Sequence, residues 1–197
     1  MIIFITVRGK CEVKLYHGTI YSSAMNIIEN GIDLVHSQKL LDFGQGFYTT
    51  PDKEHANKTA RNKALRYNKK YKKTELPVIM VFDYIENEKL RIKTFDTHNT
   101  EWMKFVLANR MNRELIKKYH ITEHNMNQKY DIVKGEIADG HITQIAAQIR
   151  NKELEYSSIS VKELLVDKGN SYGYQISFHT PEALDCIKYR KCDILFK

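Results

Sequence analysis

Cysteine is scarce in this chain. Its 197 residues include three cysteines, Cys11, Cys186 and Cys192. They are widely separated and fall into no metal-binding spacing, and their odd number does not fit a closed set of disulfide bonds. The sequence therefore excludes a disulfide-stapled secreted scaffold and a zinc finger, and it suits a reducing compartment.

Glycine, proline and long apolar runs are also few. With nine glycines and three prolines, the chain has little of the composition that keeps linkers disordered. The apolar start, Met1–Val7, is too short to span a bilayer, and it lacks the basic beginning and cleavage site of a signal peptide. We therefore expect no membrane contact and a cytoplasmic protein whose first residues form a strand.

What is present is ordinary for one folded domain. The sequence is 42% hydrophobic and 28% charged, which is enough to build a sizeable core. It contains no internal repeat, no zinc pattern and no glycine-rich dinucleotide fingerprint. We expect residues 1–197 to form a single mixed α+β domain with helices inserted between strands.

Positive charge is concentrated in one segment. The formal net charge is +7, and Lys53–Lys73 alone holds nine Lys or Arg and one Glu, so the remainder is close to neutral. A basic segment with an interleaved tyrosine, as in Lys69–Lys73, can bind the phosphates of a nucleic acid. A charge run is more often a solvated surface, and the sequence leaves both interpretations open.

Apolar patterns predict a series of strands and helices. Val78–Phe82 is an unbroken apolar run, typical of a buried central strand, whereas Tyr172–His179 alternates between two faces. Strands are predicted at residues 1–7, 12–16, 78–82, 90–95, 130–137, 172–179 and 192–196. Helical spacing of apolar residues predicts helices at 22–31, 52–67, 99–110, 142–149, 160–165 and just after 180.

Polar residues at the predicted helix starts support these boundaries. Candidate N-caps are Ser22 or Ser23, Asp52, Asn99 or Thr100, Ser160 and Thr180. Gly31 can end the first helix in a left-handed conformation. Ala56, Ala60 and Ala64 recur at a four-residue step, which turns the Lys and Arg of that helix outward.

Several spaced motifs carry a resemblance to a known family. Lys14–Thr19 reads Lys-Leu-Tyr-His-Gly-Thr, and Asp42–Thr50 reads Asp-Phe-Gly-Gln-Gly-Phe-Tyr-Thr-Thr. Glu101–Arg110 and Tyr130–Gly135 follow in the same order. Together they are similar to the diphtheria-toxin branch of mono- and poly-ADP-ribosyltransferases, and closest to an uncharacterised bacterial group of transferase-like domains. The likeness runs from Leu15 to about Leu184.

The resemblance implies a fold of split mixed β-sheets and the transfer of ADP-ribose from NAD, without a metal. It implies that His17 and Tyr48 fold together around the nicotinamide. His17 would donate to a ribose hydroxyl, Gly18 would pair with the carboxamide through its backbone, and the Tyr48 ring would stack on the nicotinamide. Further cofactor-binding positions are Thr19, Phe43, Gly44, Phe47, Thr50 and Arg110.

The third catalytic position departs from the family pattern. Where the family has a glutamate on a late strand, this chain has Gln175, which can pair with a ribose hydroxyl but adds no negative charge. Three alternatives stay open: a mono-transferase that uses Gln175, an enzyme that uses Glu136 or Asp139 instead, and a domain that binds NAD without catalysis. Arg110 can hold a phosphate or pair with a buried acid, and His55 is predicted to be a surface histidine.

The predicted function is an NAD-dependent mono-ADP-ribosyltransferase. The family context implies a bacterial toxin or defence effector that acts on a protein or a nucleic acid and is neutralised by an antitoxin protein. A catalytically weak NAD- or ADP-ribose-binding module is the first alternative. The second is a basic nucleic-acid-binding protein that uses Lys53–Lys73 and no nucleotide cofactor.

Overall fold

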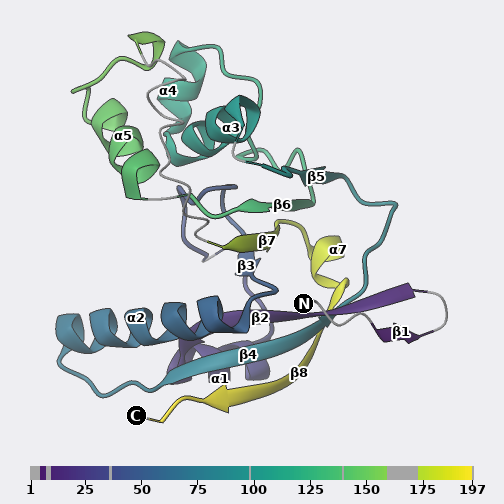
Figure 1. Cartoon of the computed structure of the whole chain (residues 1–197). Coiled ribbons are helices and arrows are strands. Elements are labelled where there is room, and N and C mark those ends of the chain that lie inside the picture. Colours follow the sequence, from purple (N-terminus) through teal and green to yellow (C-terminus); the bar gives the residue numbers. More distant parts are fainter. Residues whose placement is uncertain are drawn as a thin grey trace.

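The fold consists of two four-stranded sheets with helices packed against them (Figure 1). The structure is a computed structural model that describes residues 5–7, 10–35, 37–97, 99–138, 140–158 and 173–196. Its strands are β1 Ile5–Val7, β2 Lys10–Ile20, β3 Phe47–Thr49, β4 Pro77–Tyr84, β5 Ile92–Thr94, β6 Ile132–Glu136, β7 Tyr174–Phe178 and β8 Ile187–Ile194. Its helices are α1 Tyr21–Asn30, α2 Lys53–Tyr71, α3 Thr100–Arg110, α4 Arg113–Lys118, α5 Gly140–Arg150 and α7 Pro181–Leu184, with a 3₁₀ turn at Tyr156–Ser158.

The first sheet is antiparallel, with the strand order β1-β2-β4-β8. The apolar run predicted as a buried strand is β4, which lies between β2 and β8 and is buried from Val78 to Tyr84. The strand predicted to end at Tyr16 continues to Ile20 as β2. His17 therefore lies inside a strand, opposite Met80 of β4, rather than at a strand end.

The second sheet is mixed, with the strand order β3-β7-β6-β5. Only β5 and β6 run parallel, and β7 pairs antiparallel with both β3 and β6. The strands predicted around residues 90–95, 130–137 and 172–179 are confirmed, each with shorter bounds. This pairing brings Tyr48 of β3 opposite Ser177 of β7.

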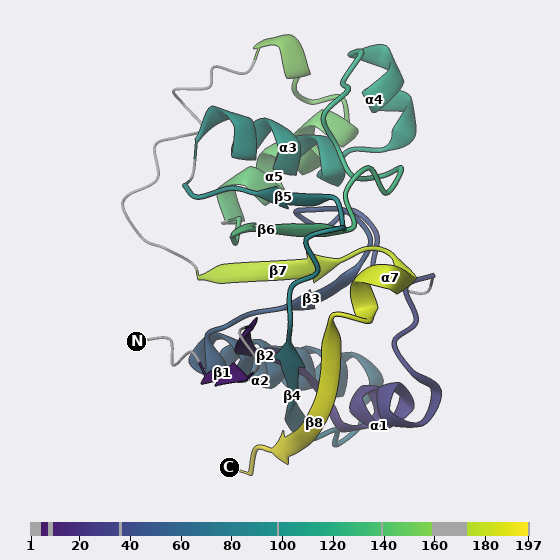
Figure 2. The same cartoon turned by 90° about the vertical axis from the view of Figure 1, so that its right-hand side faces the viewer.

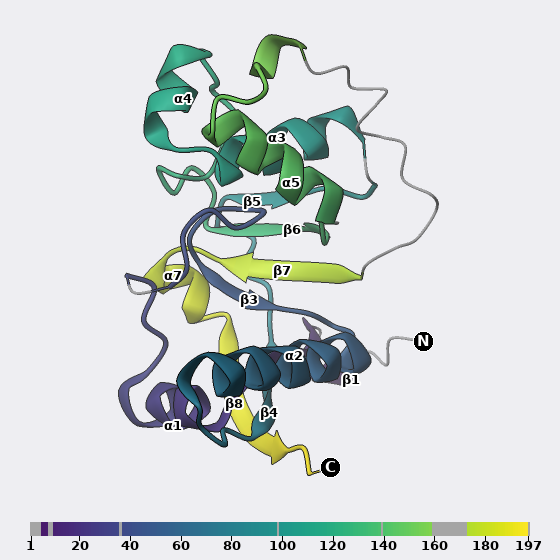
Figure 3. The same cartoon turned by 90° about the vertical axis from the view of Figure 1, so that its left-hand side faces the viewer.

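Two hydrophobic clusters hold the layers together. One lies between the second sheet and α3, α4 and α5, around Phe43, Phe105 and Val133. The other lies between the two sheets, around Leu15, Phe82 and Phe178. Figures 2 and 3 show the resulting order, with α3 and α5 above the second sheet, the first sheet below it, and α2 along the first sheet.

Helix α2 begins where the sequence predicts and packs on β2 at a glycine. Asp52 caps it, accepting from the backbone N–H groups of Glu54 and His55. Its three small apolar residues, Ala56, Ala60 and Ala64, are buried. A Cβ placed on Gly18 would come 2.1 Å from the carbonyl oxygen of Ala56, so a side chain at position 18 would push the helix off the sheet.

Some of the other predicted helix caps are confirmed by the structure, and others are not. Asn99 and Thr180 cap α3 and α7 as predicted. Neither Ser22 nor Ser23 caps α1, because the helix starts one residue earlier and its N-cap is Ile20. Gly31 ends α1 with a φ of 82°.

Near the C-terminus, one strand starts earlier than predicted. The last strand begins at Ile187 rather than Cys192, because β8 pairs with β4 along most of its length. The predicted helix at 160–165 lies outside the described residues. Among the helices that the structure describes, none has both the length and the apolar character needed to cross a membrane.

Candidate functional site

The two segments that carry His17 and Tyr48 lie side by side. Tyr16 and Thr50 exchange backbone hydrogen bonds of 2.8 and 2.9 Å, which tie β2 to the end of β3. One residue further along β2, the Nδ1 atom of His17 lies 2.7 Å from the carbonyl oxygen of Tyr48. The expected proximity of these two residues, 31 positions apart, is therefore confirmed.

A cavity of about 230 Å³ opens at this junction. It is bounded by β2, β3, β7, α2 and the end of α3. Six of the predicted site residues line it: His17, Gly18, Tyr48, Thr50, Arg110 and Gln175. Residues far apart in the sequence thus meet at one concave site, which is the usual setting for ligand binding.

The His17 ring is neutral and has a defined tautomer. Its Nδ1 faces the carbonyl oxygen of Tyr48, which can only accept, so Nδ1 carries the proton. Burial lowers the pKa of His17 to about 3, and the charge of Lys63 acts in the same direction. The other ring nitrogen, Nε2, can therefore only accept a hydrogen bond. In this tautomer His17 would accept from a ribose hydroxyl through Nε2, whereas the resemblance in sequence implies that it donates.

A second buried histidine supports the loop before β3. The Nδ1 atom of His179 lies 2.8 Å from the carbonyl oxygen of Gln45, and its Nε2 lies 2.8 Å from Oγ of Ser177. A Cβ at Gly46 would come 2.6 Å from Nδ1 of His179, so the loop can approach only through a glycine. Burial lowers the pKa of His179 to about 4.

These two histidines predict a loss of stability in mild acid. Burial keeps both neutral in the folded protein, with pKa values of about 3 and about 4. In the unfolded chain the pKa of each histidine is about 6.5. As the pH falls from 7 to 5, protons bind only to the unfolded state, so the free energy of unfolding falls by about 3 to 4 kcal/mol for the pair. Urea denaturation at the two pH values measures this difference.

Single substitutions of the histidines show how much each one contributes to this decrease in the free energy of unfolding. His17→Asn and His179→Asn should each remove about half of the decrease, because one titrating group is lost in each. His141 lies exposed at the start of α5, and His141→Asn should leave the decrease unchanged. If the free energy of unfolding fell by the same amount between pH 7 and pH 5 in all three variants, the prediction would be contradicted.

The hydroxyl of Tyr48 is occupied by the chain itself. It accepts a hydrogen bond from the backbone N–H of Phe43 at 3.0 Å and donates to the carbonyl oxygen of Gly44 at 2.6 Å. Burial, and secondarily the negative charge of Asp42, raises the pKa of Tyr48 well above its ordinary value. The hydroxyl therefore stays protonated and fixes the loop, and the ring is the part of Tyr48 that can serve a ligand.

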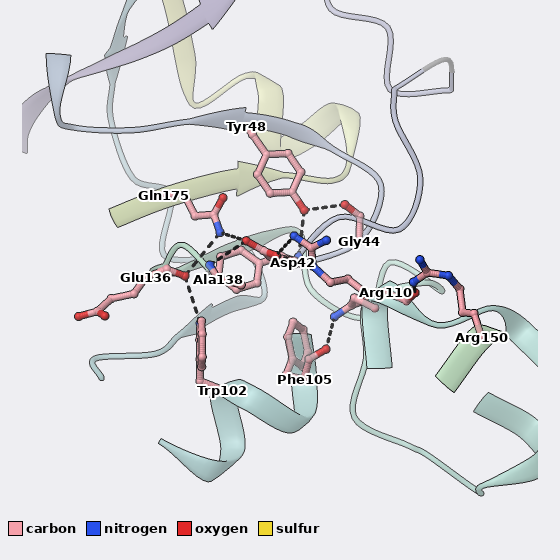
Figure 4. A network of polar contacts seen from close by, with 12 residues as sticks. Asp42, Gly44, Tyr48, Trp102, Phe105, Arg110, Glu136, Ala138, Arg150 and Gln175 are labelled. Carbon is pink, nitrogen blue, oxygen red and sulfur yellow. Dashed lines mark hydrogen bonds and ion pairs between the residues drawn. The ribbon is translucent and has the colours of Figure 1, made fainter. Parts of the chain in front are cut away.

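Asp42 is the centre of a buried polar network beside the cavity (Figure 4). Its side chain is 6% exposed. Oδ1 accepts from Nε of Arg110 at 2.7 Å and pairs with Nη2 of the same guanidinium at 2.5 Å. Oδ2 accepts from the backbone N–H of Ala138 at 3.1 Å and from Nε2 of Gln175 at 2.8 Å. Of the two roles open to Arg110, the structure shows the ion pair with a buried acid.

This network fixes the orientation of Gln175. Its Nε2 is directed at Asp42 and lies 3.5 Å from the carbonyl oxygen of Glu136. Both hydrogens of the amide are thereby engaged, which leaves Oε1 as the acceptor. Oε1 makes no hydrogen bond with any residue that the structure describes, and it points away from Asp42 in Figure 4. Gln175, 7% exposed, therefore presents a buried acceptor at the cavity.

The two alternative carboxylates for the third position are placed differently. The backbone carbonyl of Glu136 accepts from Nε1 of Trp102 at 3.1 Å, whereas its carboxylate points away from the Asp42 network in Figure 4. Asp139 lies outside the described residues. The structure therefore places Gln175, rather than Glu136, in the cavity wall.

The remaining predicted wall residues separate into two groups. Thr19 and Phe47 line a second cavity of about 650 Å³, where the Phe47 ring stacks on His17 with 4.5 Å between ring centroids. Phe43 is fully buried and belongs to the core around Phe105, so the structure places it in the core rather than in the cavity wall. Gly44 packs against Asn109 beneath the loop.

Two residues of α2 line the first cavity although the sequence suggested an outward position. His55, predicted to be a surface residue, is half-buried there. Lys63 lines both cavities. Its spacing of three and seven residues from the buried Ala60 and Ala56 was the signal that could have identified it, because such residues share one face of a helix.

Comparison with known proteins gives a family but no activity. Residues 13–189 match a family described as "Protein of unknown function (DUF3990)". No curated protein and no solved structure matches the chain. Among the described residues, no group of three or more His, Cys, Asp or Glu side chains is arranged to hold a metal ion. The chemistry of the cavity must therefore be inferred from its own residues.

Proposed function

The chain belongs to the DUF3990 family, and we propose that it is an NAD-dependent mono-ADP-ribosyltransferase. The observation that carries this proposal is the hydrogen bond between His17 and the Tyr48 backbone at the wall of a cavity that also contains Gln175. The sequence motifs around these residues resemble those of ADP-ribosyltransferases. Their convergence on one cavity is what such a function requires.

The chemistry of the transfer suits the groups that line this cavity. The bond between C1′ of the ribose and the nicotinamide nitrogen breaks, and its electron pair stays on the nicotinamide. A lone pair of the acceptor forms the new bond to C1′, and the acceptor releases a proton to solvent. Such a step needs a held leaving group and an oriented ribose more than a covalent catalyst.

Each predicted catalytic residue has a role that its geometry supports. The Tyr48 ring stacks on the nicotinamide, since its hydroxyl is held by Phe43 and Gly44. The neutral His17 accepts a hydrogen bond from one ribose hydroxyl through Nε2. Gln175 accepts from another through Oε1, which the contact with Asp42 leaves available.

The charge distribution supports single transfer rather than chain elongation. Gln175 brings no negative charge to the developing cation at C1′. The carboxylate beside it, Asp42, is neutralised by Arg110 within 2.5 Å. Electrostatic stabilisation of the transition state is therefore modest, which favours a slow mono-transferase. A module that binds NAD without transfer is the alternative that the same observation supports.

The test is the release of nicotinamide and the labelling of a cell extract from NAD labelled in its adenosine half. We expect His17→Ala and Gln175→Ala to lower both signals by about a hundredfold, because each removes a group that positions the ribose. Glu136→Ala is the control and should retain the signals, since its carboxylate points away from the network. Thermal unfolding confirms that each variant is folded.

The possible outcomes separate the candidate functions. Binding of NAD without nicotinamide release would identify a binding module. The absence of NAD binding would refute the proposal and favour a basic nucleic-acid-binding protein. Loss of activity in Glu136→Ala with retention in Gln175→Ala would move the third role to Glu136.

The labelling assay also identifies the class of the acceptor, and a growth assay tests the cellular role. Sensitivity of the labelled product to nuclease or to protease identifies its class. A nucleic acid would be expected to contact the exposed lysines and arginines of α2. A toxin or defence role predicts arrested growth on expression, and a neutralising partner protein would restore it.

A further inference from the structure

The two cavities at the site adjoin one another. The larger, of about 650 Å³, lies beside α1 and is lined by polar side chains of that helix, including Ser22, Ser23 and Asn26. Both cavities share part of their wall, which consists of His17, Gln38, Leu41, Tyr48 and Lys63. The smaller, of about 230 Å³, lies below the roughly 300 Å³ at which pockets begin to hold a whole drug-sized ligand. A dinucleotide would therefore have to extend into both.

Lys63 is the cation at this junction. It projects from the face of α2 that contains the buried Ala56 and Ala60, and it is partly buried. It makes no hydrogen bond or ion pair with the part of the chain that the structure describes. Burial, with the charge of Arg66 on the same helix, lowers the pKa of Lys63 to about 8. Holding a charged ammonium group in this partly buried position costs free energy, because the group loses contact with water and has no anion to pair with.

The other charged groups of the two cavities form no ion pair with Lys63. The carboxylate of Asp42 is occupied by Arg110. Asp33, in the wall of the second cavity, is exposed and accepts from the backbone N–H of Val35 at 2.8 Å. His17 is neutral. Lys63 is therefore a cation without a direct ion pair among the described residues, between a small cavity and a larger polar one.

We propose that Lys63 binds a phosphate of a nucleoside diphosphate that spans both cavities. The ε-ammonium would form charge-assisted hydrogen bonds with the diphosphate, while the two ends of the ligand occupy the two cavities. For NAD this rests on the proposed function, since the nicotinamide would lie in the smaller cavity. The phosphate contact itself requires no transfer reaction, and ligands that lack the nicotinamide can test it.

Isothermal titration with ADP-ribose and with ADP tests the contact directly. We expect Lys63→Met to weaken both affinities by about ten- to a hundredfold, the usual range for a lost charge-assisted hydrogen bond. Lys63→Arg should retain most of the affinity. Lys58 is exposed on the same helix, and Lys58→Met should leave both affinities unchanged.

Thermal unfolding without ligand gives a second, independent result. Methionine fills nearly the same space as lysine without the charge, so Lys63→Met should raise the melting temperature of the empty protein, and added ADP-ribose should raise it less than in the wild type. Unchanged affinity for both ligands in a folded Lys63→Met protein would overturn the inference. Weakened ADP-ribose binding in a protein that releases no nicotinamide would support Lys63 while refuting the transferase.

Discussion

An Asp42→Asn protein is expected to lose about 3 to 5 kcal/mol of its free energy of unfolding, the range for breaking one side of a buried ion pair. Four donor contacts converge on the Asp42 carboxylate, two of them from Arg110. An asparagine amide offers one acceptor oxygen and an NH2 group in place of the second oxygen. This NH2 group would face N–H donors that now bind the carboxylate, so their hydrogen bonds would be lost. It also leaves the guanidinium of Arg110, whose side chain is 16% exposed, without a counter-charge.

Urea denaturation at pH 7 measures this loss, and two further variants define its cause. Asp52→Asn makes the same chemical change at the N-cap of α2, where asparagine caps as well as aspartate, so we expect a change below about 0.5 kcal/mol. Asp42→Asn combined with Arg110→Met should be more stable than Asp42→Asn alone, because no unpaired cation remains. An Asp42→Asn protein within about 1 kcal/mol of the wild type would contradict the network as described.

Those parts of the fold with strong local signals were predictable from the sequence. The apolar run of β4 and the N-caps Asp52 and Asn99 each have a cause within a few residues. The coarse class, a mixed α+β protein, follows from such elements, whereas its division into an antiparallel and a mixed sheet depends on pairing between strands far apart in the sequence. The end of β2 could not be predicted in this way, because His17 and Gly18 stay in the strand only through pairing with β4.

The candidate site was predictable only in part, for the same reason. The motifs placed His17, Tyr48 and Gln175 in one site, and the structure brings them to one cavity. The role of Asp42 depends on partners 68 and 133 positions away, which no spacing rule connects. The sequence offered one signal, the arginine at the end of the buried α3 stripe, for which a buried acid was one of two predicted partners and a phosphate was the other.

Tyr48→Ala is expected to abolish the transfer of ADP-ribose. The variant removes the ring that would stack on the nicotinamide, and it releases the loop at Phe43 and Gly44, whose backbone the hydroxyl holds. Loss of positioning at a reacting centre lowers a rate by about a hundredfold or more. Nicotinamide release over a range of NAD concentrations measures this loss. Truncation of this large side chain should also cost about 3 to 5 kcal/mol of stability.

Tyr48→Phe separates the ring from the hydroxyl. It keeps the stacking surface but loses the hydrogen bonds to the loop, which should cost about 1 to 3 kcal/mol of stability. If the ring carries the function, Tyr48→Phe retains most of the turnover and shows a higher KM for NAD, because the cavity wall is less well held. A folded Tyr48→Ala protein that releases nicotinamide at the wild-type rate would place the reaction elsewhere. A Tyr48→Phe protein as inactive as Tyr48→Ala would instead assign the effect to the loop that the hydroxyl fixes, since the aromatic surface is the same in Phe and Tyr.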